Sequence, residues 1–378
     1  MLNPFNPHYP AEARFFANRR REQEWLKNGF LPSLDPAGAG PWNTAVLGPW
    51  GIGKSSLVRR LREMVQESAV PTGAVFVSCT TGFGSFLGFA RSLVANVRNE
   101  ILSLSAWSES VRRELEPWSV QIGVPGIAVK RERRDHTEDA ANAAEFLHSS
   151  LRRFWEKILA PAGKSLALIL DDVNLLQDID PQALMILRAV FQDLQMYRTR
   201  YGLVITGPTT LFGEVRETAE PVTRFFEHLP LGAFDRNDTA DAVRQPLLEA
   251  GAPFEVSDDA VNWVFDHTGG HPYFVAFIMR DLVAETTKRR RPVIDVDTCQ
   301  QCWPRIAGHL ETDKFNTEWL SATGAEQEVL LALARGEGVR GNQRALLARL
   351  MRKNLLVRTA RGQYELYHPL FAAFLRAR

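Results

Sequence analysis

The sequence predicts an α/β protein with a three-layer α/β/α core built on a parallel sheet. Three observations predict this fold. Short apolar runs typical of buried strands alternate with segments whose apolar residues recur at helical spacing. A glycine-rich loop joins the first of these strands to the helix after it. Near the end of the chain, helices are followed by two short strands around a turn and by a last helix, the order of elements in a winged helix.

Composition limits the classes of protein to consider. The 378 residues suffice for about two or three domains, and 45% hydrophobic with 24% charged residues is ordinary for a globular protein. A net charge of +1 gives the whole chain no attraction to nucleic acid or membrane. No apolar run approaches the roughly 18 residues of a membrane span, the start does not resemble a secretory signal, and three cysteines make no disulfide framework. We expect a cytoplasmic protein with no membrane partner.

The first predicted strand, residues 43–48, runs into the phosphate-loop pattern G-x-x-x-x-G-K-[ST] and then into a helix. Gly51 and Gly53 allow backbone angles that let successive N–H groups converge on an anion. Lys54 is expected on the β- and γ-phosphates of ATP, and the Ser55 hydroxyl on Mg²⁺. A chance glycine-rich turn is the alternative. The predicted nucleotide contacts of the loop are Gly48, Pro49, Trp50, Gly51, Ile52, Gly53, Lys54, Ser55 and Ser56. The motif does not explain why an indole stands at position 50.

A pair of acids follows a second buried strand. The apolar run 166–170 ends in Asp171 and Asp172, at the carboxyl end of the strand, where ligands bind in open α/β sheets. We expect Asp171 to hold the metal ion through water near Ser55, and Asp172 to orient the attacking water. The alternative is an N-cap pair that starts the next helix.

More strands are expected between and after these motifs. Residues 74–79 read as a strand and 86–102 as a helix, while a helix over 181–200 precedes a strand over 202–207. Thr206 lies at the end of that last strand. In P-loop ATPases with an inserted strand, this end holds a hydroxyl or amide near the γ-phosphate, so Thr206 is a candidate sensor. The alternative is a residue of high β-propensity at a strand end.

One insertion interrupts the core. Residues 117–134 alternate β-type residues around Pro-Gly and end in a basic run, which indicates a hairpin. The hairpin could contact DNA or a neighbouring subunit, or it could be a solvated loop.

The order of these motifs resembles that of AAA+/STAND-type ATPases, close to archaeal-type ATPases and the origin-recognition (Orc1/Cdc6) branch, over nearly the whole chain. The segment 3–26 resembles the entry segment of that group, with its pattern F-x-G-R-x-x-E at Phe16, Asn18, Arg19 and Glu22. Asn18 stands where the group has glycine. The resemblance implies that Phe16 or Arg19 lies near the adenine base. A solvated helix start is the alternative.

The same resemblance implies an arginine finger and a helical lid. Arg224, in the turn after the sensor strand, matches the finger that reaches the γ-phosphate of a neighbouring subunit, although it could equally be a surface arginine. A G-x-P at 270–272 opens a lid helix and places Pro272 against the base. No arginine follows in the first turn of that helix, and Arg280 is a distant substitute for a second sensor. This departure favours the STAND-like side of the group.

The last segment is a candidate DNA-binding domain. From residue 321 onward it carries ten Lys/Arg against four Asp/Glu. Basic residues stud its longest helix and its wing, at Arg344, Arg349, Arg352, Lys353, Arg358 and Arg361. Such residues contact phosphates with little regard to base sequence. A solvated face or a contact with a protein is the alternative, because the helix that a winged helix has before residue 343 is reduced to a short segment here.

We therefore expect an ATPase core over 1–234, a helical lid over 235–295 and a winged-helix-like domain over 296–378. The expected activity is Mg²⁺-dependent binding and slow hydrolysis of ATP to ADP by an AAA+/STAND-like switch. This switch would control a homo-oligomer or associate with DNA. The alternative is a non-hydrolysing adaptor that is gated by ADP and ATP and works through a partner protein. The pair Cys299 and Cys302 lacks the further ligands that a zinc site needs.

Overall fold

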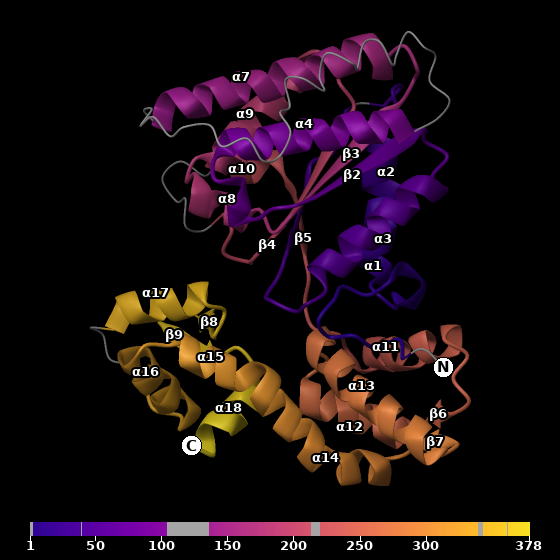
Figure 1. Ribbon diagram of the computed structural model, residues 1–378, viewed down its shortest axis with the longest axis vertical. Coiled ribbons are helices and arrows are strands. Elements are labelled where there is room, and N and C mark those ends of the chain that lie inside the picture. The colour runs from indigo at the N-terminus through magenta and orange to yellow at the C-terminus, as the bar shows by residue number, and fades with distance from the viewer. Residues whose placement is uncertain (1–2, 39, 104–135, 213–219, 339–342, 361) are drawn as a thin grey trace. The chain divides into compact units, whose positions relative to one another are not determined.

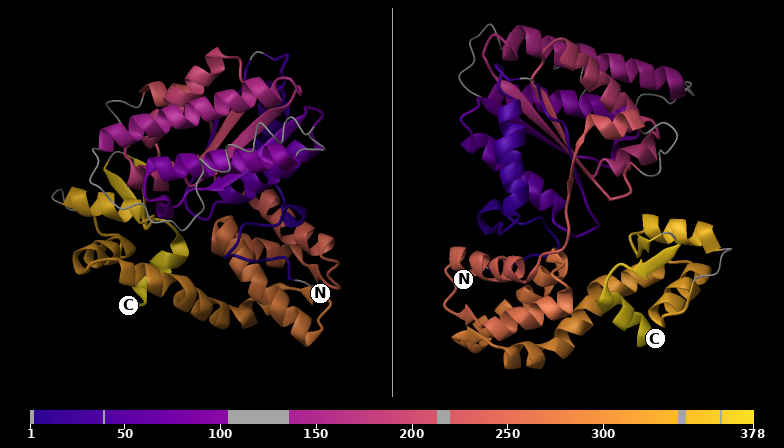
Figure 2. Two further views of the ribbon diagram at one scale, coloured as in Figure 1. Left: turned by 45° about the horizontal axis from the view of Figure 1, so that its top comes forward. Right: turned by 180° about the vertical axis from the view of Figure 1, so that it is seen from behind.

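The computed structural model describes residues 3–38, 40–103, 136–212, 220–338, 343–360 and 362–378 (Figures 1 and 2). The described chain divides into two compact units. One contains residues 19–48 and 54–231, and the other contains residues 1–18, 49–53 and 232–378. The predicted hairpin over 117–134 and the basic residue Arg361 lie outside the described residues.

The first unit is built on a parallel sheet in the order β2-β3-β4-β1-β5. Its strands are β1 (Thr44–Leu47), β2 (Thr72–Ser78), β3 (Ser165–Asp171), β4 (Tyr201–Gly207) and β5 (Glu227–Pro230). Every residue of β3 and β4 is buried, because helices cover both faces, and this explains their continuous apolar runs. The strands predicted from the sequence are confirmed. β4 lies between the loop strand β1 and the acid strand β3, as the inserted-strand prediction requires.

Helices form the two outer layers of this unit (Figure 1). On one face, α4 (Phe86–Ser103), α7 (His136–Phe154) and α9 (Ala183–Met196) share a continuous core with alternate residues of the strands. α3 (Lys54–Glu67) and the segment that contains α1 (Arg20–Trp25) and α2 (Leu31–Ser33) cover the other face. On that face Gly202 is required, since a Cβ there would lie 2.4 Å from the Leu34 side chain. Two shorter helices, α8 (Asn174–Ile179) and α10 (Glu220–Phe225), complete the unit. The predicted three-layer α/β/α core is confirmed.

After residues 1–18 and 49–53, the second unit continues with the helices of the expected lid, which are α11 (Arg236–Glu249), α12 (Asp258–Thr268) and α13 (Pro272–Arg289). Two short parallel strands, β6 (Glu255–Val256) and β7 (Val293–Ile294), were not predicted, because two-residue strands leave no periodic signal in a sequence. β7 lies at the end of the segment 235–295 that was expected to form the lid.

The C-terminal elements follow without a break. They are α14 (Val296–Leu310), α15 (Asn316–Ser321), α16 (Gly324–Ala334), α17 (Arg344–Arg352), the antiparallel pair β8 (Leu356–Ala360) and β9 (Gln363–Leu366), and α18 (Pro369–Arg376). The predicted helices and hairpin of this segment are therefore present. One hydrophobic core runs from the lid helices into these elements through Phe274, Phe315 and Phe371. No helix in the described ranges combines the length and apolarity needed to cross a membrane.

Candidate nucleotide-binding site

The predicted acid pair and Thr206 are joined by hydrogen bonds at the carboxyl ends of β3 and β4. The Thr206 hydroxyl donates to Asp171 Oδ1 at 2.6 Å and accepts from the Asp172 N–H at 2.8 Å. Thr206 is fully buried and Asp171 is 5% exposed. Because β4 is paired directly with β3, one hydroxyl orients both acids. Its role as a γ-phosphate sensor stays a prediction, and the bond to Asp171 is an additional role that the sequence did not indicate.

Asp172 occupies a backbone conformation that non-glycine residues avoid. Its φ is 56°, in the left-handed region, and the hydrogen bond from its N–H to Thr206 holds it there. Such conformations cost free energy and cluster at functional sites. Burial raises the pKa of the Asp172 carboxyl, the neighbouring Asp171 raises it further, and Lys54 lowers it. Asp172 is thus a partly desolvated carboxylate with a cation nearby, in keeping with a group that handles water.

Lys54 is the first residue of α3, and its ammonium group reaches back to Gly48 at the start of the loop. Its Nζ donates to the carbonyl oxygen of Gly48 at 3.0 Å. Burial lowers the pKa of Lys54, while Asp172 and Asp171 raise it. A half-buried cation close to two carboxylates is of the kind that can neutralise a triphosphate. The structure therefore brings Lys54, Asp171, Asp172 and Thr206 together, while their catalytic roles stay predictions.

Ser55 and Ser56 follow in the first turn of α3, and both are half-buried. A hydroxyl at this position and a buried carboxylate at the end of β3 are oxygen donors of the kind that Mg²⁺ prefers. The donor set fits a magnesium ion bound by Ser55 and Asp171. That assignment stays a prediction.

Residues 49–53 of the loop belong to the second compact unit, where they contact the start of α13. The carbonyl of Gly51 accepts from the Tyr273 N–H at 3.2 Å, and the carbonyl of Trp50 lies 3.1 Å from Nε2 of His271. Gly51 has a φ of 72°, and a Cβ on it would lie 2.9 Å from Tyr273 Cβ. Gly51 is thus required both by its backbone angle and by the close approach of α13. Gly53, with a φ of 95°, is required by its angle alone.

The G-x-P pattern at the start of α13 has a steric cause. Gly270 has a φ of 71°, and a Cβ there would lie 2.0 Å from the carbonyl oxygen of Phe234. The carbonyl of Gly270 accepts from the Phe234 N–H at 2.9 Å. Pro272 is the first residue of α13, a position that needs no N–H donor. The placement of Pro272 against a base stays a prediction.

The backbone of the entry segment explains why asparagine can replace the glycine of the family pattern at position 18. Asn18 has a φ of 76° and Arg19 a φ of 59°, so both lie in the left-handed region. Asparagine is the residue that best replaces glycine there. Arg19 is buried and pairs with Glu22 at 3.4 Å. Phe16 is half-buried, and its contact with the base, like that of Arg19, stays a prediction.

The remaining candidates lie on helices. Arg224 is exposed in the last turn of α10, and its role as a finger stays a prediction. Arg280 donates to Asp281 at 2.8 Å, in the middle of α13. Cys299 and Cys302 are buried in α14, and burial raises the pKa of Cys299 to about 12.

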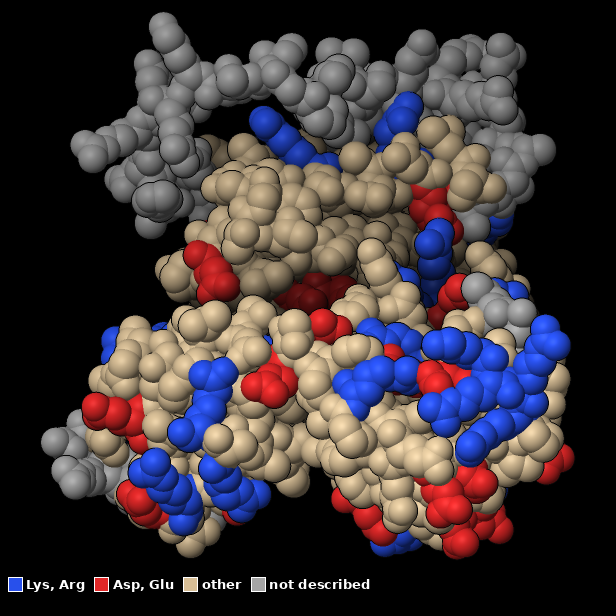
Figure 3. Space-filling model, turned by 60° about the horizontal axis from the view of Figure 1, so that its bottom comes forward, with Lys and Arg blue, Asp and Glu red and all other residues tan. Residues whose placement is uncertain are grey.

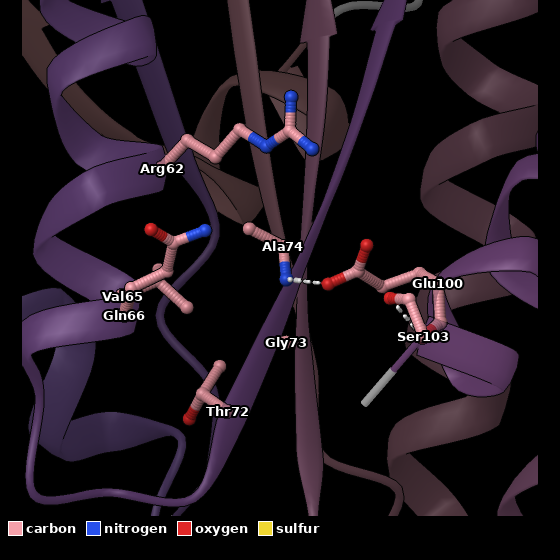
Figure 4. A pocket seen from close by; sticks show the side chains of 8 residues that line it. All are labelled: Arg62, Val65, Gln66, Thr72, Gly73, Ala74, Glu100 and Ser103. Atoms are coloured by element: carbon pink, nitrogen blue, oxygen red, sulfur yellow. Dashed lines mark hydrogen bonds between the residues drawn. The ribbon is translucent and has the colours of Figure 1, made fainter. Parts of the chain in front are cut away.

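A cavity of about 210 Å³ lies elsewhere, beside the beginning of β2 (Figure 4). Glu100 reaches into it from α4 and accepts from the Ala74 N–H at 3.1 Å. Because Thr72 to Ala74 form the amino end of β2, while Asp171 pairs with Ser78 at the carboxyl end, this cavity is not the candidate site.

Sequence reasoning missed two partners of the loop, His271 and Lys314. The ammonium of Lys314 lies 3.5 Å from the centroid of the Trp50 ring. The sequence offered only the G-x-P motif beside His271 as a signal, and nothing singled out Lys314. Long-range contacts of this kind leave no local pattern in a sequence.

Comparison with known proteins agrees with this fold. Residues 19–205 match the family model of the AAA ATPase domain. The ORC2 protein of Aeropyrum pernix, solved in ADPNP–ADP complexes, is 14% identical with a TM-score of 0.55 over 95% of this chain and 94% of that chain. The Orc1 protein of Aeropyrum pernix in complex with DNA is 14% identical with a TM-score of 0.52 over 95% and 92%. A Walker-type ATPase of Pyrococcus abyssi is 15% identical with a TM-score of 0.50 over 94% and 95%.

No curated protein sequence matches the chain. The structural likenesses, at such low identity, concern the fold. The family match and the sheet order together establish the class. Residues 19–205 belong to the AAA ATPase domain family, and the fold is that of an AAA+ P-loop ATPase.

Proposed function

We propose that this protein binds ATP with Mg²⁺ and hydrolyses it slowly, and that the nucleotide state controls an assembly or an association with DNA. The arrangement of Lys54, Asp171, Asp172 and Thr206 carries the proposal. These residues combine a desolvated cation for phosphate, an oriented acid for the metal ion and a second acid for water.

Each residue has a distinct task. The loop amides and Lys54 neutralise the β- and γ-phosphates, which lets negative charge develop on the leaving phosphate. Ser55 and Asp171 would hold Mg²⁺, which would supply positive charge to offset the negative charge of the phosphates. Asp172 orients the attacking water. Thr206 keeps both acids in place, and in the ATP complex it lies near the γ-phosphate.

Slow turnover follows if an arginine from a second copy completes the site. Arg224 is the candidate, because it is exposed and lies on a short helix after β4. A finger of this kind is worth about 10³ to 10⁵ in rate. We expect that Arg224→Ala leaves ATP affinity unchanged but removes the increase in turnover that accompanies rising protein concentration. Normal, concentration-dependent hydrolysis by the variant would exclude the finger.

The excess of Lys and Arg from residue 321 onward supports an association with DNA, and the Aeropyrum Orc1 protein of the same fold was solved with DNA. Arg344, Arg352 and Arg358 are exposed on α17 and β8. Arg349 and Lys353 instead pair with the buried Glu326, at 3.2 and 2.7 Å, so the basic face is narrower than the sequence indicated.

A second basic area lies on the lid. Figure 3 shows a dense group of Lys and Arg side chains over the lid helices, with Asp and Glu side chains beside it, and a mixture of both kinds over the C-terminal helices. At the end of α13, Lys288 and Arg290 are exposed, next to Arg289, which pairs with Glu285. Phosphate contacts from both areas would give salt-dependent binding.

A turnover assay tests the proposal. Phosphate release by the wild type, with and without duplex DNA, is compared with release by Lys54→Ala and Asp172→Asn. We expect Lys54→Ala to lose ATP binding, and Asp172→Asn to bind ATP but release no phosphate above background. Equal release by the wild type and Asp172→Asn, together with intact nucleotide binding, would establish the non-hydrolysing adaptor instead. ATP binding that survives Lys54→Ala would refute the site.

A gel shift at two salt concentrations, with ATP and with ADP, tests the association with DNA. We expect binding that weakens at the higher salt and differs between the two nucleotides. If no shift appears at low salt, the nucleotide state would control an assembly or act through a partner protein and not through DNA.

A further inference from the structure

The indole of Trp50 is held by side chains that come from far along the chain. Its ring centroid lies 4.6 Å from that of Tyr273, in a tilted arrangement. On the indole sits the ammonium of Lys314, 3.5 Å from the centroid. The same ammonium lies 4.9 Å from the Tyr273 ring and 5.5 Å from the Tyr367 ring. Three aromatic rings therefore surround one cation, and one of the rings belongs to the phosphate loop.

Lys314 is unusually buried for a lysine, with 8% of its surface exposed. It lies in the π-helical turn Glu311–Phe315, between α14 and α15. Its Nζ donates to Glu318 Oε1 at 2.7 Å, and Glu318 Oε2 accepts from the Tyr367 hydroxyl at 2.8 Å. Burial lowers the pKa of Lys314 and Glu318 raises it, so the carboxylate favours the charged form. The cation is thus fixed by the C-terminal helices and presented to the loop.

The backbone of the phosphate loop is bound by the same compact unit that carries Lys314. The carbonyls of Trp50 and Gly51 are both engaged by the start of α13, through His271 and the Tyr273 N–H. In a trans peptide the C=O and the following N–H point in opposite directions. The N–H groups of Gly51 and Ile52 are therefore directed away from α13. Such an orientation suits N–H groups that converge on a phosphate.

We propose that Lys314 is a positioning residue, which acts through Trp50 to hold the phosphate loop in its nucleotide-binding conformation. This inference rests on the proposed function and extends it. The C-terminal helices carry Lys314, so a ligand that moves them changes the affinity of the loop for nucleotide. The indole at position 50 is then the part of the loop that the C-terminal helices recognise.

The test is a double-mutant cycle on nucleotide affinity. Lys314→Met removes the charge and keeps much of the volume, and Trp50→Leu removes the ring and leaves the lysine. Affinity is measured by titration with a fluorescent ADP analogue. Loss of a desolvated cation–π contact predicts that each single variant binds on the order of tenfold more weakly. The double variant should bind no more weakly than either single one, because both changes remove the same contact.

Two further variants separate positioning from general stability. Lys314→Arg keeps a cation over the ring and should recover most of the affinity. Arg376→Met removes an exposed basic residue of α18 in the same compact unit and should leave affinity unchanged. In saturating ATP, Lys314→Met should turn over within about twofold of the wild type, because it changes binding and not the acids.

The failures of the two proposals are distinguishable. A wild type that binds no nucleotide refutes the proposed function, and this inference with it. If the wild type binds and Lys54→Ala does not, but Lys314→Met and Trp50→Leu bind as tightly as the wild type, the inference alone is overturned. Independent, additive losses in the cycle would overturn it as well. Should Lys314→Met fail to fold, Trp50→Leu and Lys314→Arg still give the comparison, since equal and unchanged affinities in both refute the contact's role.

Discussion

Replacement of Thr206 with valine isolates the hydroxyl that orients the two acids. Valine keeps the shape of the side chain and fits a buried strand position, so β4 itself should persist. The change removes a 2.6 Å hydrogen bond to Asp171 and the acceptor of the Asp172 N–H. Asp171 is 5% exposed, so water does not readily replace the lost donor.

The expected cost follows from these two losses. A hydrogen bond to a charged group contributes roughly 1.5–3 kcal/mol, and an unsatisfied donor costs roughly 1–3 kcal/mol. We expect Thr206→Val to lower the free energy of unfolding by about 3 kcal/mol. Displacement of the acids should also lower turnover by about 100-fold, because misplacement of catalytic groups by about 1 Å costs that much.

Urea denaturation and phosphate release in saturating ATP measure the two effects. Thr44→Val is the matched control, because Thr44 is fully buried in β1 and its hydroxyl finds no partner among the described residues. That control should be neutral or stabilising. Thr206→Ser keeps the hydroxyl, loses one methyl and should retain turnover. If Thr206→Val unfolds at the wild-type urea concentration and hydrolyses at the wild-type rate, the hydrogen bonds do not position the acids.

Three other predictions concern single residues. Asp172→Asn should raise the free energy of unfolding at pH 7, because the raised pKa of the carboxyl means that its charged form opposes folding. This gain should shrink as the pH falls and Asp172 in the wild type takes up a proton. A gain that does not change with pH would contradict this cause. Burial lowers the pKa of His368 from 6.5 to about 4, so the free energy of unfolding should fall by about 3 kcal/mol as the pH falls through that window. In His368→Gln, urea denaturation at a series of pH values should show a smaller dependence of the free energy of unfolding on pH. Gly270→Ala should cost about 3 kcal/mol or more in the free energy of unfolding, since its Cβ would overlap the Phe234 carbonyl; a thermal midpoint equal to that of the wild type would argue against the overlap.

The candidate site shows which of its residues can be predicted from short segments of the sequence. Lys54, Asp171 and Asp172 could be predicted because each follows a strand or opens a helix, and because the carboxyl ends of parallel strands meet at one edge of a sheet. Asn18 could be named as a departure from the pattern, but its reason, a φ of 76°, is visible only in the backbone. Thr206 was predicted at the right edge of the sheet, while its bond to Asp171 required the pairing of β3 with β4.

The sequence by itself determined the phosphate loop, the acids and the strands and helices that carry them, because strand burial, helical spacing and glycine angles are properties of short segments. Only the tertiary structure decided what Trp50 does. Its partners, Tyr273 and Lys314, lie more than 200 residues away along the chain, and a cation over an aromatic ring has no sequence period. The tertiary structure likewise decided that Glu326 forms ion pairs with Arg349 and Lys353, since ion pairs between helices depend on packing and not on composition.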